Sequence, residues 1–133
     1  CHPRSRNRLT TSGFKLDSRV IQHEPLGFHD YNCLQMNAYA VVSDSGTLPE
    51  ESSFFTSVGY PFPAICIRTS TERPEALDAG TVKLVGTDYN KIVSEVSILL
   101  DDASAYEQMS KAINPYGDGK ACMRITQTLN VRL

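Results

Sequence analysis

Short apolar runs alternate along the chain with longer segments in which apolar residues recur at helical spacing. Three of these runs have the length and composition of buried strands: residues 38–42, 64–67 and 82–85. From residue 92 onward, Ile92, Val96 and Leu99 lie three or four positions apart. This spacing predicts an amphipathic helix, and Asp88 just before it is a suitable N-cap. Strands that alternate with single helices indicate an α/β fold.

The remaining segments complete this alternation. Further helices are predicted over residues 4–9, over 30–37 with Asp30 as cap, from Thr47 or Leu48, from within 71–75, over 104–113 behind the capping box Ser104-Ala105-Tyr106-Glu107, and from Lys120 onward. Such an order predicts a Rossmann-like parallel sheet flanked by helices, formed by one domain over residues 1–133. In this fold the turns that follow the strands face a common crevice, so ligand chemistry is expected there.

Composition narrows the function classes. The chain has 133 residues, 41% of them hydrophobic, and a net charge of −2, which argues against a disordered tail and against a polycationic nucleic-acid binder. Its apolar runs are far shorter than the roughly 20 residues of a membrane span. Four dispersed cysteines without a CxxC pair favour a reduced, cytoplasmic protein, and the three histidines show no metal-ligand spacing. The start at Cys1, with no signal-peptide pattern, suggests a fragment of a longer protein.

The turn after the first strand carries the strongest signal. It reads Ser45-Gly46-Thr47, and Thr47 with Glu50 forms a capping box that would open a helix. Backbone N–H groups at a helix start favour an anion such as a diphosphate, and Gly46 would let it approach closely. Glu51, one turn further on, could accept hydrogen bonds from vicinal ribose hydroxyls. The alternative is that these residues only cap the helix and offset its dipole.

A second turn follows the next strand and reads Arg68-Thr69-Ser70-Thr71-Glu72-Arg73-Pro74-Glu75. Pro74 is tolerated in the first turn of a helix, so a helix start is predicted here. The forked guanidinium of Arg73 would then point toward the same crevice and suit a diphosphate. The alternative is a surface ion pair of Arg73 with Glu72 or Glu75.

Several strings, in this order and spacing, resemble the non-hydrolysing UDP-N-acetylglucosamine 2-epimerase family. They are HPR at 2–4, DSG at 44–46, the glutamate pair 50–51, TERPEA at 71–76, AGTV at 79–82, LVGT at 84–87 and NPYGDG at 114–119. The resemblance covers the C-terminal half of such an enzyme. It implies a two-domain architecture like that of one large class of glycosyltransferases, with the N-terminal domain absent and the active site in the cleft between the domains.

The same resemblance assigns roles to residues. It implies that Ser45 and the backbone of Gly46 and Thr47 hold the diphosphate of a UDP-sugar, that Glu51 holds the ribose and that Arg73 lies near the phosphates. The uracil would lie against the loop 25–31, where Phe28 or Tyr31 is available to stack. No catalytic residue and no cofactor is expected in this chain, because the family's acid/base carboxylates come from the N-terminal domain.

The resemblance extends to partners and regulation. The full-length protein is expected to be a homodimer with no nucleic-acid or membrane partner. His2 and Arg4 belong to a basic cluster that resembles a regulatory nucleotide-sugar contact in some members of the family, although a solvated helix face is the simpler interpretation.

The implied reaction inverts C2 of the sugar by anti elimination of UDP to a 2-acetamidoglucal, followed by re-addition of UDP. Thr47 and Pro49 stand where the main branch has Gly and Gln. Four strings lean toward a sister branch that makes UDP-N-acetyl-L-fucosamine by the same C2 inversion: DY at 30–31, LQMNA at 34–38, DSGT at 44–47 and EESS at 50–53. The strings AGTV at 79–82 and NPYGDG at 114–119 favour the glucosamine branch instead. A UDP-sugar glycosyltransferase and a non-catalytic UDP-binding module remain as alternatives, and the ERPE and NPYGDG strings argue against the transferase.

Overall fold

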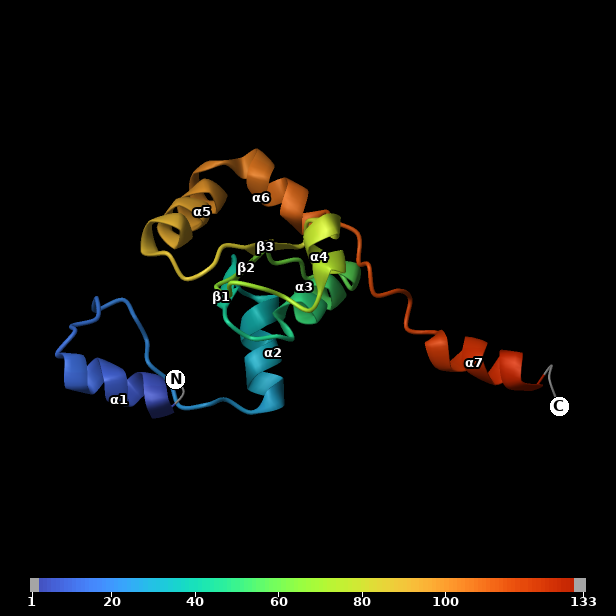
Figure 1. Cartoon of the computed structure of the whole chain (residues 1–133), viewed down its shortest axis with the longest axis horizontal. Helices are drawn as coiled ribbons and strands as arrows, with labels where there is room; N and C mark the ends of the chain where they lie inside the picture. Colours follow the sequence, from blue (N-terminus) through green and yellow to red (C-terminus); the bar gives the residue numbers. More distant parts are fainter. Residues whose placement is uncertain (1–2, 131–133) are drawn as a thin grey trace. The chain divides into compact units, whose positions relative to one another are not determined.

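The computed structural model describes residues 3–130 as helices joined to a small sheet (Figure 1). In chain order the elements are α1 (Pro3–Ser12), α2 (Phe28–Met36), β1 (Val41–Ser43), α3 (Leu48–Ser57), β2 (Ala64–Cys66), α4 (Pro74–Ala79), β3 (Val82–Leu84), α5 (Tyr89–Asp101), α6 (Ala103–Ser110) and α7 (Ala121–Asn130). The chain divides into two compact units, one that ends at Leu34 and one that begins at Gln35. The expectation of a single UDP-binding domain over residues 1–133 stays a prediction.

The sheet of the second unit is parallel, with the strand order β1-β2-β3. Helix α3 connects β1 to β2, and α4 connects β2 to β3. The predicted α/β class, with a Rossmann-like parallel sheet flanked by helices, is therefore confirmed. Ser43 pairs with Cys66, and Cys66 with Leu84, so the three strands end at one edge of the sheet and the turns after them begin side by side.

The first strand is shorter than predicted and starts at Val41 instead of residue 38. The backbone N–H of Ala38 donates to the carbonyl of Gln35, which closes the end of α2. The ring of Tyr39 stacks on Tyr106 with centroids 4.3 Å apart, and its hydroxyl donates to the carbonyl of Leu99. The hydrogen bonds of Ala38 and Tyr39, and the stacked ring of Tyr39, give this segment partners other than a neighbouring strand.

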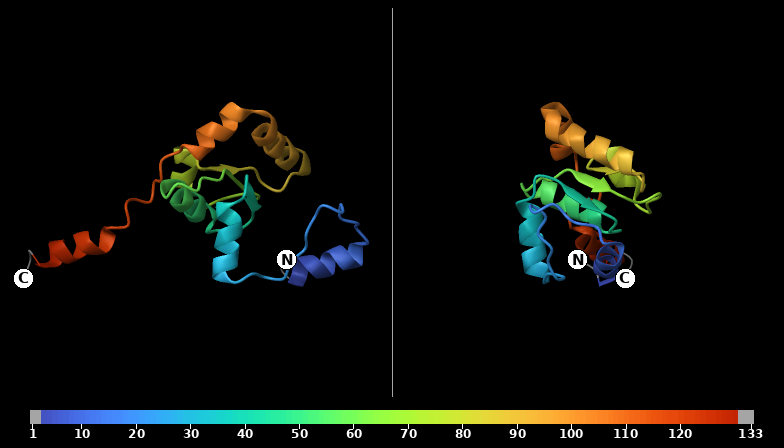
Figure 2. Two further views of the ribbon diagram at one scale, coloured as in Figure 1. Left: turned by 180° about the vertical axis from the view of Figure 1, so that it is seen from behind. Right: turned by 90° about the vertical axis from the view of Figure 1, so that its left-hand side faces the viewer.

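The central strand β2 divides the core into two clusters because its side chains alternate between the faces of the sheet. Ala64 and Cys66 pack with the buried residues of α3 and α4. Ile65 packs on the other face with Leu99 of α5 and Met109 of α6. Figures 1 and 2 show the corresponding layers, with α5 and α6 on one side of the sheet and α3 on the other.

The structure shows which residues cap α5 and α6. Asp88 caps α5, because its Oδ1 accepts a hydrogen bond from the N–H of Lys91 at 2.9 Å, as predicted. The predicted box at Ser104 is wrong. Asp102 caps α6 instead. Its carboxylate, two residues before Ser104, accepts hydrogen bonds from the N–H groups of Ser104 and Ala105 and thereby satisfies both donors.

Two further boundaries differ from the predictions. Helix α6 ends at Ser110, three residues before the predicted end at 113. Asp30 lies inside the first turn of α2 and does not cap it. The final helix is confirmed as α7, and Asp118 accepts from the N–H of Lys120 just before it.

Within residues 3–130, none of the helices has the length and apolar character needed to cross a membrane.

Candidate functional site

The candidate site lies where β1 and β2 end. The turn 44–47 follows β1, and Arg68 follows β2 by two residues. A Cβ atom added to Gly46 would lie 3.2 Å from Nη1 of Arg68, so the guanidinium occupies the space left by the missing side chain. Arg68 was not among the site residues predicted from the sequence, although its position two residues after the central strand was a usable signal. Glycine at position 46 thus admits a cation against the backbone of the turn.

The turn itself is held by its own hydroxyl groups. The N–H of Ser45 donates to Oγ of Ser43 at 3.0 Å, and the N–H of Thr47 donates to Oγ of Ser45 at 3.3 Å. The sequence suggested that the N–H groups of Ser45, Gly46 and Thr47 are free. Those of Ser45 and Thr47 are engaged, the latter by a long hydrogen bond. An anion would replace that weak contact.

Thr47 is the N-cap residue of α3 but makes no side-chain cap bond, so the predicted Thr47–Glu50 capping box is wrong. Its hydroxyl donates instead to Oε1 of Glu51 at 2.6 Å. A hydroxyl has one proton to donate, so Ser45 donates in the 2.9 Å contact between the two hydroxyl oxygens. The turn and Glu51 are therefore one hydrogen-bonded chain.

Glu51 has a second partner in Gln35, near the end of α2. Nε2 of Gln35 donates to Oε2 of Glu51 at 2.6 Å, and the Gln35 residue is only 3% exposed. Gln35 was not among the site residues predicted from the sequence. The available signal was a polar residue inside the otherwise apolar run Cys33-Leu34-Gln35-Met36.

The neighbouring carboxylate, Glu50, has a cationic partner. Nε of Arg73 donates to Oε1 of Glu50 at 2.7 Å, and Nη1 of Arg73 donates to the carbonyl of Glu72 at 3.3 Å. The ion pair that the sequence suggested, with the carboxylate of Glu72 or Glu75, is not the one that forms. The hydrogen bond that Arg73 donates to Glu50, more than the charge of that carboxylate, raises the pKa of Arg73 above its ordinary value.

Tyr116, from the NPYGDG string, lies beside this ion pair. Burial, followed by the charges of Glu50 and Glu75, raises the pKa of Tyr116, while the charge of Arg73 lowers it. Gly117 and Gly119 flank the turn at φ values of 92° and 74°, where a side chain would be strained. The TERPEA string at 71–76 and the NPYGDG string at 114–119 thus meet at one place.

Both glutamates are positioned by two serines that follow them on α3. Ser52 donates to the carbonyl of Phe62 at 3.0 Å, and Ser53 shares a 3.1 Å hydrogen bond with the hydroxyl of Thr81. All three hydroxyl-bearing residues are fully buried. Small, satisfied polar side chains let the helix pack closely on the core. They also fix which way Glu50 and Glu51 point.

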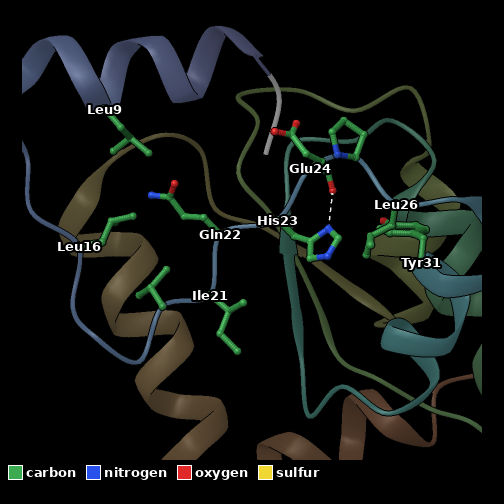
Figure 3. Close-up of a pocket in the computed structure, with 10 residues that line it drawn as sticks. Leu9, Leu16, Ile21, Gln22, His23, Glu24, Leu26 and Tyr31 are labelled. Atoms are coloured by element: carbon green, nitrogen blue, oxygen red, sulfur yellow. Dashed lines mark hydrogen bonds between the residues drawn. The ribbon is translucent and has the colours of Figure 1, made fainter.

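The other predicted residues belong to the first unit. Tyr31 of α2 borders a cavity of about 510 Å³ whose other walls are mostly apolar, among them Leu9, Leu16 and Ile21 (Figure 3). Phe28 is not among the lining residues and is 78% exposed. A uracil contact by either residue stays a prediction.

Arg4 lies on α1 and lines a second cavity of about 520 Å³ with Ser5, Asn7 and Arg8. His2 lies outside the described residues. A regulatory role for the two stays a prediction. Among residues 3–130 there is no cluster of three metal-ligating side chains.

A parallel sheet with helices on both faces, and a polar turn at the carboxyl ends of its strands, defines a Rossmann-like ligand-binding unit. The family model described as UDP-N-acetylglucosamine 2-epimerase matches residues 1–130. The chain belongs to that family.

Relatives and solved structures agree with this assignment. The chain is 47% identical over 110 residues to the UDP-N-acetylglucosamine 2-epimerase of Yersinia pestis and 46% identical over 110 residues to that of Escherichia coli K12. These matches cover 83% of this chain and 28% of each relative. The S. aureus MnaA–UDP co-structure matches with a TM-score of 0.81 and 34% identity, over 98% of this chain and 34% of that one. The chain therefore spans about a third or less of the length of these proteins.

Proposed function

We propose that this chain is the UDP-binding part of a UDP-N-acetylglucosamine 2-epimerase, which converts UDP-N-acetylglucosamine to UDP-N-acetylmannosamine for surface polysaccharide precursors. The observation that carries the proposal is the grouping of Ser45, Gly46, Arg68 and Glu51 at the carboxyl ends of β1 and β2. Hydroxyls and a guanidinium suit a diphosphate, and a nearby carboxylate suits ribose hydroxyls.

Two relatives support the choice of ligand. S. aureus MnaA was solved with UDP, and the Methanocaldococcus jannaschii UDP-GlcNAc 2-epimerase was solved with UDP-GlcNAc and UDP. Each match covers 98% of this chain. We infer that Ser45, Gly46, Thr47 and Arg68 contact the diphosphate, and that Arg73 acts near it through the side of its guanidinium that is turned away from Glu50.

The proposed chemistry divides between two parts of the whole protein. Elimination of UDP develops negative charge on the departing diphosphate, which fixed donors and a guanidinium stabilise without reorganisation. The proton at C2 must be removed by a base on another face of the sugar, and we assign that base to the preceding domain. The present chain then binds UDP and is inactive alone.

A second candidate is the sister reaction that makes UDP-N-acetyl-L-fucosamine. One observation favours it, because Gln35 and Thr47, which both hold Glu51, belong to the strings that resemble that branch. The two candidates share UDP and C2 inversion and differ in the sugar at C4 to C6.

Calorimetric titration of the protein that contains this chain with UDP tests the binding proposal. We expect saturable binding that Arg68→Ala and Glu51→Ala each weaken at least tenfold. Gly46→Ala should weaken it as well, because its methyl group displaces the Arg68 guanidinium. Gln108→Ala, at an exposed position of α6, serves as the control. Absence of binding at millimolar UDP would contradict the site.

Incubation of the full-length protein with UDP-N-acetylglucosamine in deuterated water tests the reaction. Elimination and re-addition exchange the hydrogen at C2, so we expect deuterium at that position in both epimers by mass spectrometry. A parallel incubation supplies UDP-N-acetyl-L-fucosamine in deuterated water. If deuterium enters this sugar nucleotide and not UDP-N-acetylglucosamine, the second candidate replaces the first.

A further inference from the structure

The hydrogen bonds of Glu51 show how a binding carboxylate is oriented before its ligand arrives. Thr47 donates to Oε1 and Gln35 donates to Oε2, both at 2.6 Å. One donor on each oxygen defines the plane of the carboxylate as well as its position. A free glutamate side chain samples many rotamers, so this arrangement lowers the entropy lost when a ligand binds.

The two donors come from different parts of the fold. Thr47 belongs to the exposed turn that opens α3, four residues before Glu51. Gln35 is fully enclosed near the end of α2 and is 16 residues away in the sequence. Gln35 therefore fixes Glu51 relative to the packed core, whereas Thr47 fixes it only relative to its own turn.

The chemical type of the buried donor is informative. A lysine or arginine at position 35 would neutralise Glu51, as Arg73 does for Glu50. An amide donates a hydrogen bond without adding charge, so Glu51 keeps the charge that makes it a strong acceptor for hydroxyl groups.

We propose that Gln35 is a positioning residue that sets the Glu51 carboxylate to accept the vicinal hydroxyls of a ribose, and thereby determines selectivity for ribonucleotides over deoxyribonucleotides. This inference rests on the proposed function, in which Glu51 contacts the ribose of UDP. It adds a residue outside that contact, whose role is to hold the contacting group.

The test compares UDP with 2′-deoxy-UDP by calorimetry on the full-length protein. Gln35→Met keeps the length and burial of the side chain and removes its donor. We expect the variant to bind UDP about threefold to tenfold more weakly and 2′-deoxy-UDP nearly as well as before, so that the ratio between them narrows. Gln108→Met, the same change at an exposed position of α6, serves as the matched control.

A second variant gives a readout that a merely structural role would not move. Gln35→Glu places a carboxyl group against Glu51. When ionised it repels Glu51, and when protonated it donates a hydrogen bond in place of the amide. The terminal phosphate of UDP also gains a proton in this range, and that change is common to both proteins. We therefore expect the ratio of the variant's UDP affinity to that of the unaltered protein to rise toward one as the pH falls from 8 to 5.

The possible results distinguish a failure of the proposed function from a failure of the positioning role of Gln35. Unaltered protein that binds no UDP overturns both the proposed function and this inference. Unaltered protein that binds UDP, combined with an unchanged ribose-to-deoxyribose ratio in Gln35→Met, overturns the positioning role alone. If Gln35→Met does not fold, an affinity of Gln35→Glu that follows the same pH dependence as the unaltered protein overturns it equally.

Discussion

Glu50 and Glu51 are neighbours on α3, and the fold gives them opposite kinds of partner. Glu50 forms a 2.7 Å ion pair with Arg73, next to Tyr116. Glu51 is held by a hydroxyl and an amide, which are neutral donors. Two identical side chains on one helix therefore differ in their surroundings, because one belongs to a half-exposed ion pair and the other accepts from a hydroxyl and an amide.

The largest expected effect comes from the matched pair Glu51→Gln and Glu50→Gln. The first change removes the charge that we assign to ribose binding, and we expect UDP to bind about tenfold to thirtyfold more weakly. The second releases Arg73 from a half-exposed ion pair, and we expect a change of only about twofold to fourfold. Calorimetric titration measures both. Equal losses in the two variants would end the distinction between the glutamates.

Thr81→Val tests what the two glutamates share, since the buried Ser53–Thr81 contact holds the helix that carries both. The change keeps the shape but leaves the Ser53 hydroxyl without this partner, so we expect the free energy of unfolding to fall by about 1–2 kcal/mol in urea denaturation. Thr87→Val, at an exposed position, should change it by less than about 0.5 kcal/mol. A value for Thr81→Val as small as that of the control would show that the contact does not anchor α3.

Thr47→Val tests the exposed donor to Glu51. It removes the hydroxyl that bonds to Oε1, and we expect UDP affinity to fall about threefold. Thr47→Ser keeps the hydroxyl and should restore most of the affinity. If the serine variant is as weak as the valine variant, the hydroxyl alone does not account for the affinity, and the role assigned to the Thr47 donor is contradicted.

The smallest expected effect concerns the pKa of Tyr116. Glu50 contributes to raising it, so Glu50→Gln removes a negative charge and also frees the charge of Arg73, and both changes lower the pKa. We expect the pKa to move toward the ordinary value of tyrosine. Carbon NMR of the labelled tyrosine ring across a pH titration measures it. Glu51→Gln should leave this pKa unchanged, and a matching shift in that variant would contradict the separation of the two carboxylates.

The sequence by itself determined the order of strands and helices, the parallel sheet and the place of the polar turn. Apolar runs and their spacing report burial locally, so β2, α5 and α7 follow from the pattern of residues. The caps at Ser104 and Thr47 were wrong because a local motif does not reveal a competing partner, which was Asp102 in one case and Glu51 in the other.

Only the tertiary structure decided the partners of the two glutamates. Gln35 and Arg73 are separated from the glutamates that they contact by 16 and 23 positions of sequence, and no local pattern announces either contact. Contacts of this kind depend on how α2 ends and on which strand ends lie side by side. The sequence names the carboxylates, and the packing of distant segments decides that Glu50 pairs with an arginine and that Glu51 accepts from an amide.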